Sequence, residues 1–391
     1  MGATRIAVLN SHPIQYFAPM YAYLCRDPGL EITALYCSDF SLRQGLDPGF
    51  GERITWDVDL LEGYRCVFLG PRAKSRNPAG FFSLVCPEVW SEVRSGKYDV
   101  LWLHGYAYAA DLIAFLAAKT RGIPVFMRSE THLGLSRAPL RQRIRDAVLS
   151  VFYRFIDAFL AIGTPNANYY KALGVAADRI HLVPYTVDNH RFIEGARDDR
   201  ATVRRRFGIA DDEVVVLFAS KLTPRKRAAD LLRAAALLQS RGHRATVLLV
   251  GSGESKAELE ALASELGLAR AIFAGFVNQS SLPGILGAVD AFVLPSESEP
   301  WGLIVNEAMC AGLPVIVTDQ VGAAGDLVTP RNGFVYGVGG IEALAKALEA
   351  LVTDANKRRT MGLASLDIIR KWSYEQCREG LQSAIRTVCR A

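Results

Sequence analysis

The sequence alternates strand-length apolar runs with helix-length stretches, and it does so in two successive series. Seven runs make up the first series, from RIAVLN (5–10) to RIHLVPY (179–185), and five make up the second, from EVVVLFAS (213–220) to LPVIVTD (313–319). Unbroken apolar strands separated by helices are typical of parallel sheets covered on both faces. The pattern therefore predicts an α/β protein with two doubly wound, Rossmann-like domains.

A polar, charged stretch at residues 186–208 separates the two series and has the composition of an exposed linker that leads into a helix. At 391 residues the chain is also longer than a single core usually grows. We therefore predict a first domain over 1–195 and a second over 196–371. Ligands of doubly wound sheets bind at the carboxyl ends of the strands, so residues directly after the runs are the functional candidates.

The composition of the chain limits which binding partners and which cellular compartment can be expected. The formal net charge of +5 is small for this length, and Lys and Arg occur in both halves, so no nucleic-acid groove is indicated. Seven cysteines without a CxxC spacing favour a reducing compartment over a disulfide or zinc framework. No apolar run reaches 18 residues, and the start lacks a secretory pattern. We expect a cytoplasmic protein.

A basic turn, KLTPRKR (221–227), follows the first strand of the second series and precedes a predicted helix. Lys221 and Lys226 can offer charge to an anion, and a helix N-terminus adds oriented N–H dipoles. A diphosphate would fit there, although a solvated basic turn explains the residues equally well. The glycines of VGSGE are explained more simply by a tight turn than by a phosphate cradle, and Gly251 stays among the donor-side candidates.

Two glutamates, in SESEPWGLIVNE (296–307), flank a Pro-Trp-Gly that cannot all be helical. We expect a helix that begins near Gly302, with Glu307 inside it and Glu299 in the preceding loop. A fully helical span would separate the glutamates by about 12 Å, which approaches the reach from a sugar ring across a diphosphate to a ribose. Carboxylates accept hydrogen bonds from neighbouring hydroxyls, so Glu307 suits the ribose and Glu299 a hexose. The alternative is a helix-flanking Glu299 and a solvated Glu307.

The stretch from Glu299 to Glu307, followed by AMCAGLPVIVTD, resembles the E-x7-E signature of retaining glycosyltransferases of family 4. The resemblance spans nearly the whole chain and is specific in the second half. It implies the GT-B fold, in which two Rossmann-like domains face each other across a cleft. It also implies that the C-terminal helix, within 372–391, crosses back onto the first domain.

The same resemblance assigns donor-side residues. Ser220-Lys221-Leu222 stand where the family has Gly-Arg-Leu, and Lys226 stands where it has a lysine. Lysine at 221 keeps the charge of arginine but lacks its planar fork. Val277 falls where the backbone meets the base, and N–H groups at the helix start are expected to face the ligand. The predicted donor-binding residues are Ser220, Gly251, Val277, Trp301, Gly302, Leu303 and Glu307.

Fewer residues of the first half can be assigned. By resemblance, His104, after the run VLWL, matches the strand-end histidine beside the donor sugar. His12 and Gln15 follow the first run and would present polar groups near the diphosphate. Glu130 and His132 follow the run VFM. We take His12, Gln15, Glu130 and His132 as acceptor-binding candidates; ordinary hydrogen-bonded structural histidines are the alternative for His12 and His104.

Three further features of the first half allow more than one interpretation. Segment 38–56 is long enough to frame the acceptor site with aromatics such as Phe50 and Trp56, which could equally close small cores. The helix predicted in 137–159 has an apolar stripe that could lie on an anionic membrane, but packing on the sheet is the favoured interpretation. Asp57 and Asp59 have the D-x-D arrangement by which a different glycosyltransferase fold holds a metal, but they are expected in a surface ribbon away from the donor motifs.

Together these patterns predict a retaining glycosyltransferase that moves a hexosyl unit from a nucleotide diphosphate sugar to an acceptor hydroxyl. A UDP-sugar is a guess from frequency, and the acceptor is a small molecule, a glycan or a lipid. Lys221, Lys226, Glu299 and His104 are the predicted catalytic residues. Because the lysines can neutralise the phosphates, we expect neither a metal nor a cofactor. The alternatives are a hydrolysing nucleotide-sugar epimerase and a catalytically silent nucleotide-sugar-binding subunit.

Overall fold

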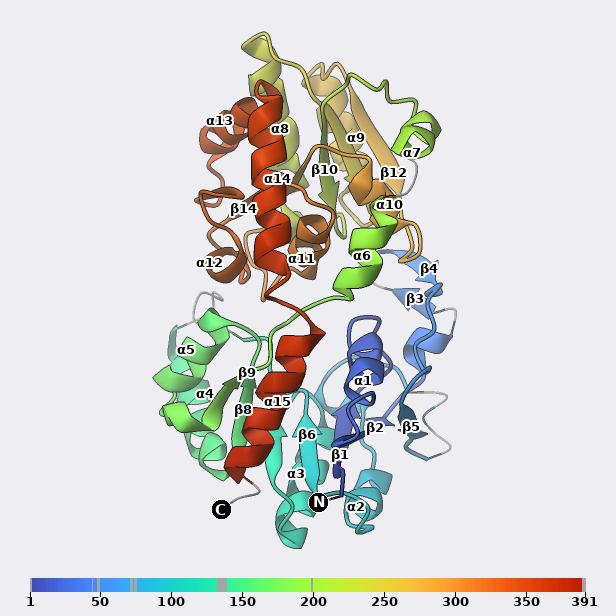
Figure 1. The fold of residues 1–391 in the computed structure, drawn as a ribbon, viewed down its shortest axis with the longest axis vertical. Coiled ribbons are helices and arrows are strands. Elements are labelled where there is room, and N and C mark those ends of the chain that lie inside the picture. The colour runs from blue at the N-terminus through green and yellow to red at the C-terminus, as the bar shows by residue number, and fades with distance from the viewer. Residues whose placement is uncertain are drawn as a thin grey trace. The chain divides into compact units, whose positions relative to one another are not determined.

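The computed structural model describes residues 2–43, 45–47, 50–70, 73, 76–131, 139–197 and 200–388, with the side chains of 45–47 and 139–141 left out. The chain divides into two compact units (Figure 1). Unit 1 consists of residues 1–45, 58–185 and 374–391, and unit 2 of residues 46–57 and 186–373.

Unit 1 is built on a parallel sheet with the strand order β5-β2-β1-β6-β7-β8-β9. Its strands are β1 (Thr4–Asn10), β2 (Leu30–Tyr36), β5 (Arg65–Phe68), β6 (Val100–Leu103), β7 (Val125–Met127), β8 (Ala158–Ala161) and β9 (Ile180–Leu182). Its helices are α1 (Ala18–Leu24), α2 (Glu88–Val93), α3 (Ala109–Arg121), α4 (Pro139–Phe152), α5 (Thr164–Ala172) and α15 (Tyr374–Val388). Strands such as β6 are wholly buried, so helices must cover both faces.

Unit 2 repeats this architecture with the parallel strand order β12-β11-β10-β13-β14-β15. Its strands are β10 (Val215–Ala219), β11 (Thr246–Val250), β12 (Ala271–Gly275), β13 (Ala291–Leu294), β14 (Val315–Thr318) and β15 (Gly333–Tyr336). Its helices are α6 (Asn189–Gly195), α7 (Arg200–Arg206), α8 (Ala228–Ser240), α9 (Lys256–Glu265), α10 (Leu282–Gly287), α11 (Leu303–Cys310), α12 (Ala324–Leu327), α13 (Ile341–Val352) and α14 (Ala355–Ile369).

The predicted fold class is confirmed, because every apolar run in the two series overlaps a strand of the corresponding sheet. The sequence analysis missed β15, as well as the two-stranded ribbon of β3 (Gly45–Asp47) and β4 (Glu52–Ile54). The region of this ribbon also differs from the predicted domain boundaries. Residues 46–57 group with unit 2, although the sequence analysis placed them in the first domain.

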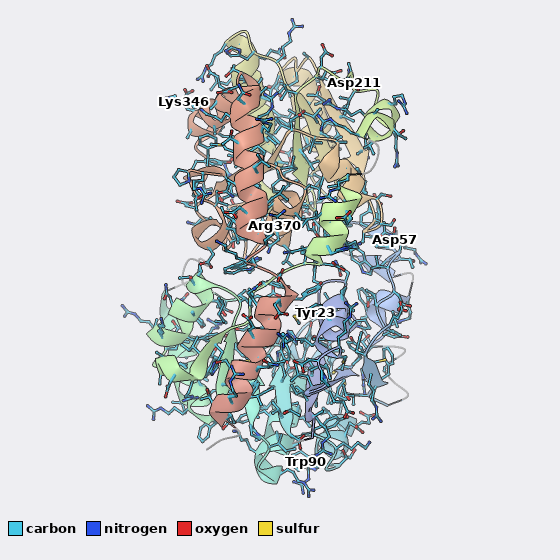
Figure 2. The ribbon with its side chains drawn as sticks, in the orientation of Figure 1. Tyr23, Asp57, Trp90, Asp211, Lys346 and Arg370 are labelled. Atoms are coloured by element: carbon cyan, nitrogen blue, oxygen red, sulfur yellow. The ribbon has the colours of Figure 1, made fainter. Side chains whose placement is uncertain are left out.

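The C-terminal helix α15 groups with unit 1, where it contacts β8, β9 and α1. Its Cys377 thiol lies 3.1 Å from the Pro184 carbonyl oxygen. On α1, the Tyr23 hydroxyl (Figure 2) donates a 2.7 Å hydrogen bond to Glu375. Leu381 and Ala384 are fully buried, so the apolar side of this helix faces unit 1.

Helix α4 departs from the interpretation favoured by the sequence. Its residues Ile144 and Val148 are 60% and 62% exposed, and Val151 and Phe155 are also more than half exposed. On the other side of the helix, Leu149 belongs to the core of unit 1 and Phe152 packs against that core. The helix thus has two apolar faces, and the longer stripe is not packed on the sheet. No helix in the described ranges is both long and apolar enough to cross a bilayer.

Candidate functional site

A lysine–glutamate pair lies at the carboxyl edge of the unit 2 sheet. Lys226 ends the 3-10 turn Pro224–Lys226 after β10, and Glu299 lies in the loop after β13. The Lys226 ammonium donates a hydrogen bond to Glu299 Oε2, and Arg225 Nη1 lies 3.8 Å from the same oxygen. Burial lowers the pKa of Lys226, Glu299 raises it, and Lys221 and Arg225 add smaller lowering effects. Lys221 and Glu299 therefore both act on the charge of Lys226, in opposite directions.

The backbone around Lys226 is fixed by the residue that follows it. Arg227 has a φ of 52° and is the one non-glycine residue with a positive φ in the described part of the chain. This conformation disfavours an L side chain, and the guanidinium is held by Asp230, with a 2.7 Å contact from Nε to Oδ2. The loop of Glu299 is tied to the same turn, because Glu297 N donates to the Arg225 carbonyl at 3.0 Å.

The bend between the two glutamates is centred on Gly302. Its φ of 94° places it in the left-handed region, and α11 begins at the next residue, as predicted. A Cβ at 302 would lie 3.1 Å from Leu294 and 3.2 Å from Glu299. The loop is held on the following one, because Gly322 N donates to the Glu299 carbonyl at 2.9 Å. A Cβ at Gly322 would lie 2.1 Å from the Pro300 carbonyl oxygen, so these loops approach too closely for a side chain.

Glu307 is fully buried within α11, which excludes the alternative of a solvated surface glutamate. Its charge contributes, after burial, to raising the pKa of the Cys310 thiol. Trp301 is buried as well, and its indole Nε1 donates to Asn306 Oδ1 at 3.0 Å. The same ring stacks on Trp372 at 5.5 Å. The Trp301 side chain thus has a structural role at the start of α11, where Leu303 also lies.

The glycine-rich turn after β11 packs directly on the end of β10. Gly251 has a φ of 138°, and a Cβ there would lie 1.9 Å from the Ser220 carbonyl oxygen. The two turns are joined by a hydrogen bond of 2.8 Å from Leu222 N to the Ser252 carbonyl. Packing within the protein therefore explains the need for glycine at 251. It also positions Ser220 and Lys221, at the end of β10, beside this turn.

Residues 50–57 lie on the same edge of the unit 2 sheet. The ring of Phe50 contacts Phe276 at 5.0 Å, and the Lys221 ammonium lies 4.6 Å from the centre of the Phe50 ring. Trp56 contacts Phe276 at 6.2 Å. Phe50 and Trp56 thus belong to unit 2 rather than to the first domain, and their packing on the residue next to Val277 agrees with the alternative that they close a small core.

Asp57, which Figure 2 labels, lies against the loop that follows β12 and is therefore closer to the donor motifs than the sequence analysis supposed. Its carboxylate accepts hydrogen bonds from the Ser280 hydroxyl and, at 3.1 Å, from the Ser280 N–H. Ser280 follows Val277 in the loop after β12. Asp59 instead accepts from its own turn, from Leu61 N at 2.8 Å. Both carboxylates of the D-x-D pair thus bind the protein itself.

In unit 1, His104 follows β6 as expected. Its Nε2 lies 2.7 Å from the Tyr21 hydroxyl, and its ring stacks on Trp102 at 5.2 Å. Asn10 already donates to that hydroxyl at 2.8 Å, so the Tyr21 proton is available to His104 Nε2. Burial and the nearby Arg128 hold the pKa of His104 well below its usual value. His104 is therefore a neutral imidazole at pH 7.

Two of the acceptor-binding candidates, His12 and Glu130, contact polar side chains within unit 1. His12 Nδ1 lies 2.9 Å from Ser11 Oγ, Gln15 is partly exposed after β1, and Glu130 accepts a 2.6 Å hydrogen bond from the Tyr185 hydroxyl. His132 lies outside the described residues. The sequence analysis did not identify Tyr21 or Asn10; the only available signal was the polar Asn10 at the end of an apolar strand.

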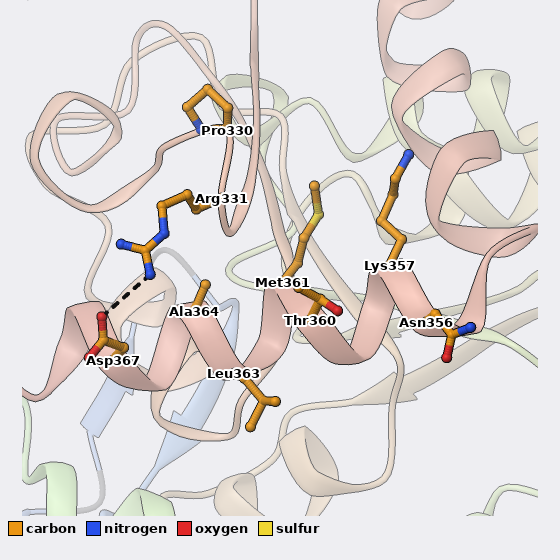
Figure 3. A pocket seen from close by; sticks show the side chains of 9 residues that line it. All are labelled: Pro330, Arg331, Asn356, Lys357, Thr360, Met361, Leu363, Ala364 and Asp367. Atoms are coloured by element: carbon orange, nitrogen blue, oxygen red, sulfur yellow. Dashed lines mark ion pairs between the residues drawn. The ribbon is translucent and has the colours of Figure 1, made fainter.

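A surface hollow runs along α14 (Figure 3), where Arg331 and Asp367 lie 3.7 Å apart. Leu363 and Met361 contribute apolar surface to it. None of the predicted site residues lines this hollow. It is therefore distinct from the cluster around Lys226 and Glu299.

Comparisons with known proteins identify the family. The family model of glycosyl transferases group 1 matches residues 199–365, and that of the glycosyl transferase 4-like domain matches residues 20–186. A relative in Mycolicibacterium smegmatis, named GDP-mannose-dependent alpha-(1-6)-phosphatidylinositol monomannoside mannosyltransferase, is 30% identical over 72% of this chain and 73% of its own. The chain belongs to family 4 of the glycosyltransferases. The family that the sequence analysis predicted is thereby confirmed.

Two further matches show how much of this chain is similar to known glycosyltransferases in sequence and in structure. An uncharacterized glycosyltransferase of Methanocaldococcus jannaschii is 31% identical over 46% of this chain and 46% of its own length. The crystal structure of Anabaena HepE in complex with UDP and glucose has a TM-score of 0.72 and 19% identity, and the match covers 98% of this chain and 99% of that one. At this identity the likeness shows the shared GT-B fold. The family models and the named relatives thus show that this chain is an enzyme of the glycosyltransferase class.

Proposed function

We propose that the protein transfers a hexosyl unit from a nucleotide diphosphate sugar to an acceptor hydroxyl with retention of configuration and without a divalent metal. The observation that carries the proposal is the cluster of Lys221, Lys226 and Glu299 at the carboxyl edge of the unit 2 sheet. Ligands of doubly wound sheets bind at this edge. The complex of HepE with UDP and glucose supports a donor of this class.

Lys226 and Lys221 would stabilise the diphosphate as it leaves. During the reaction the bond between the anomeric carbon and the phosphate oxygen breaks, and the acceptor oxygen forms the new bond to that carbon. The acceptor proton passes to the departing phosphate oxygen. Negative charge therefore grows next to two fixed ammonium groups, and loss of one such preorganised donor typically slows kcat by about 10²–10³-fold. No protein nucleophile is needed for this balance of charge and protons.

The carboxylates would hold the sugars at either end of the diphosphate. Glu299, whose Oε2 accepts a hydrogen bond from the Lys226 ammonium, would also accept hydrogen bonds from hydroxyls of the hexose. Glu307, fully buried in α11, would accept from the ribose diol. Burial strengthens such charge-assisted hydrogen bonds because water competes less. In unit 1, neutral His104 with its Tyr21 partner would orient a sugar hydroxyl rather than donate a proton as an imidazolium.

We further propose a lipid-bearing acceptor, for which the exposed face of α4 is the supporting observation. Ile144, Val148 and Val151 form an apolar row, bordered by the exposed Arg143 and by Arg154 in the turn after the helix. An apolar row beside basic side chains is typical of helices that lie on anionic membranes. The lipid acceptor in the name of the M. smegmatis relative agrees with this choice.

A two-step experiment tests the proposed activity. Thermal shifts with UDP, GDP and their sugars identify the donor, since a ligand at 100 times its dissociation constant adds about 2.7 kcal/mol of stability. Transfer to an acceptor panel is then measured in EDTA, and the anomer of the product is read by NMR. Epimer formation without acceptor would instead identify an epimerase. Nucleotide binding without turnover on any acceptor would identify a silent subunit.

A further inference from the structure

The segment Phe50–Asp57 contacts three successive loops at the carboxyl edge of the unit 2 sheet. Its Phe50 meets Lys221, which follows β10. The Ser252 hydroxyl, after β11, donates to the Glu52 carboxylate. Phe50 also contacts Phe276, which follows β12. One short stretch of chain thus spans the strand ends at which this fold binds its ligand.

Polar contacts anchor the far end of the segment. Asn278 Nδ2 donates to the Thr55 carbonyl at 2.7 Å, and Asn278 Oδ1 lies 3.4 Å from Asp57 N. Ser280 donates to both oxygens of Asp57, once through its hydroxyl and once through its N–H at 3.1 Å. The anchor therefore involves both side chains and backbone on each partner. These bonds fix where Phe50 and Trp56 stand relative to Phe276.

Phe50 contacts both a cationic side chain and an aromatic side chain at this edge of the sheet. Its ring centre lies 4.6 Å from the Lys221 ammonium and 5.0 Å from the ring centre of Phe276. Lys221 is the cation proposed for the diphosphate, and Phe276 adjoins Val277, the proposed contact of the base. A nucleoside diphosphate presents a flat ring and an anion within one molecule. The aromatic group of Phe50, Trp56 and Phe276 is partly exposed, so a base can reach it.

We propose that Phe50 and Trp56, encoded in the first half of the chain, form with Phe276 the wall on which the nucleobase of the donor stacks. The inference rests on the proposed nucleotide-sugar function and adds to it the residues that contact the base. Stacking on an aromatic side chain is tolerant of base identity and contributes about 1–3 kcal/mol, or roughly 5- to 150-fold in affinity. Asp57, Asn278 and Ser280 are positioning residues that hold the wall in place.

Calorimetric titration with UDP, GDP and inorganic pyrophosphate tests the proposal, because pyrophosphate carries the anion without the base. Phe50→Ala and Trp56→Ala should each weaken the tighter nucleotide by about 10-fold and leave pyrophosphate unchanged. Asp57→Asn should weaken the nucleotide in the same sense by releasing the anchor. Trp90→Phe, at an exposed tryptophan of α2 in unit 1, is the matched control and should change neither affinity.

The outcomes are separable. If both alanine variants are folded and bind the nucleotide as tightly as the wild type, the aromatic wall is excluded. If the alanine variants bind the nucleotide more tightly than the wild type, the segment covers the site and competes with the nucleotide. If Phe50→Ala weakens nucleotide and pyrophosphate equally, Phe50 only supports Lys221. Either result overturns the proposal. If the wild type binds none of the three probes, the proposed function itself fails, and this inference with it. Should Trp56→Ala not fold, Trp56→Leu keeps bulk without the aromatic face.

Discussion

The Lys226 ammonium donates a hydrogen bond to the Glu299 carboxylate, and the two side chains keep only 11% and 12% of their surface exposed. This pair joins the turn after β10 to the loop after β13. A buried ammonium is costly unless it is paired. The pairing explains how a cation can stand at the sheet edge before any anionic ligand arrives.

Replacing Lys226 by Ala should reduce kcat by about 10²–10³-fold, because the developing charge on the leaving diphosphate loses a preorganised ammonium. Steady-state kinetics with the donor identified by thermal shift measure this loss. Lys346→Ala is the matched control, since Lys346 is an exposed lysine of α13 whose side chain is 71% exposed. An unchanged kcat in Lys226→Ala would remove this residue from the mechanism.

Glu299→Gln should move the alkaline limb of the kcat profile to lower pH. Lys226 acts as an ammonium, so activity is lost as pH rises through its pKa. Burial lowers that pKa and Glu299 is the largest influence that raises it, so loss of the carboxylate lowers it further. The variant can also turn over more slowly at every pH because it has lost a contact with the sugar. The kcat values measured between pH 6 and 10 are therefore divided by the maximum for each protein, and the pH at which they fall to half gives the position of the limb. A limb that stays in place would mean that Glu299 does not control Lys226.

Glu307→Gln should weaken UDP or GDP, whichever binds tighter, by about 10-fold or more, since a hydrogen bond to a charged group contributes about 1.5–3 kcal/mol. The 2′,3′-dideoxy form of the same nucleotide lacks the ribose diol and is the comparison. It should bind the wild type and the variant alike in calorimetry. Equal losses for both nucleotides would assign Glu307 a structural role within α11 instead.

The α4 surface predicts association with anionic vesicles. The wild type should co-sediment with vesicles that contain phosphatidylglycerol and less with phosphatidylcholine alone. The double variant Ile144→Ser/Val148→Ser should lose at least 10-fold in partitioning, since each buried side chain of this size contributes about 1.5–3 kcal/mol. Leu363→Ser, which replaces a leucine of α14 that is 61% exposed in unit 2, is the control. A wild-type dimer that the double variant dissociates in light scattering would assign the face to a second copy.

Gly302→Ala should destabilise the protein by about 1–2 kcal/mol, because the left-handed conformation at 302 is unfavourable for a side chain. The added Cβ would also crowd Leu294 and Glu299. Gly337→Ala is the control, since its Cβ would meet nothing within 4 Å and its φ is not in the left-handed region. Chemical denaturation of the three proteins measures the difference. Equal stabilities would show that the bend does not depend on glycine.

Local sequence patterns predict those features that depend on near neighbours in the chain. The strands and the helix start at Gly302 are of this kind. A buried strand requires a short apolar run, and a left-handed turn favours glycine, so both can be recognised within a few residues of sequence. The charge cluster of Lys221, Lys226 and Glu299 could be predicted because all three follow strands of one parallel sheet, whose carboxyl ends meet at one edge.

Other features depend on contacts that no local pattern records. Glu52 and Ser252 are 200 residues apart in sequence, and Asp57 and Ser280 are 223 apart. Nothing in the composition of 50–57 distinguishes a loop over the acceptor from one that docks on the second sheet. Helix α4 presents a related difficulty. It has two apolar faces, and periodicity alone cannot tell which one, that of Ile144 or that of Leu149, packs on the sheet.

The grouping of residues 46–57 with unit 2 has a consequence for engineering chimeric glycosyltransferases. A splice at 185/186, the evident place to join the first half of one enzyme to the second half of another, would supply the second half with a foreign Phe50–Asp57 segment. Ser252, Asn278 and Ser280 would then face side chains with which they had not been selected. Hybrids that carry residues 46–57 over together with their own second half should keep native donor affinity.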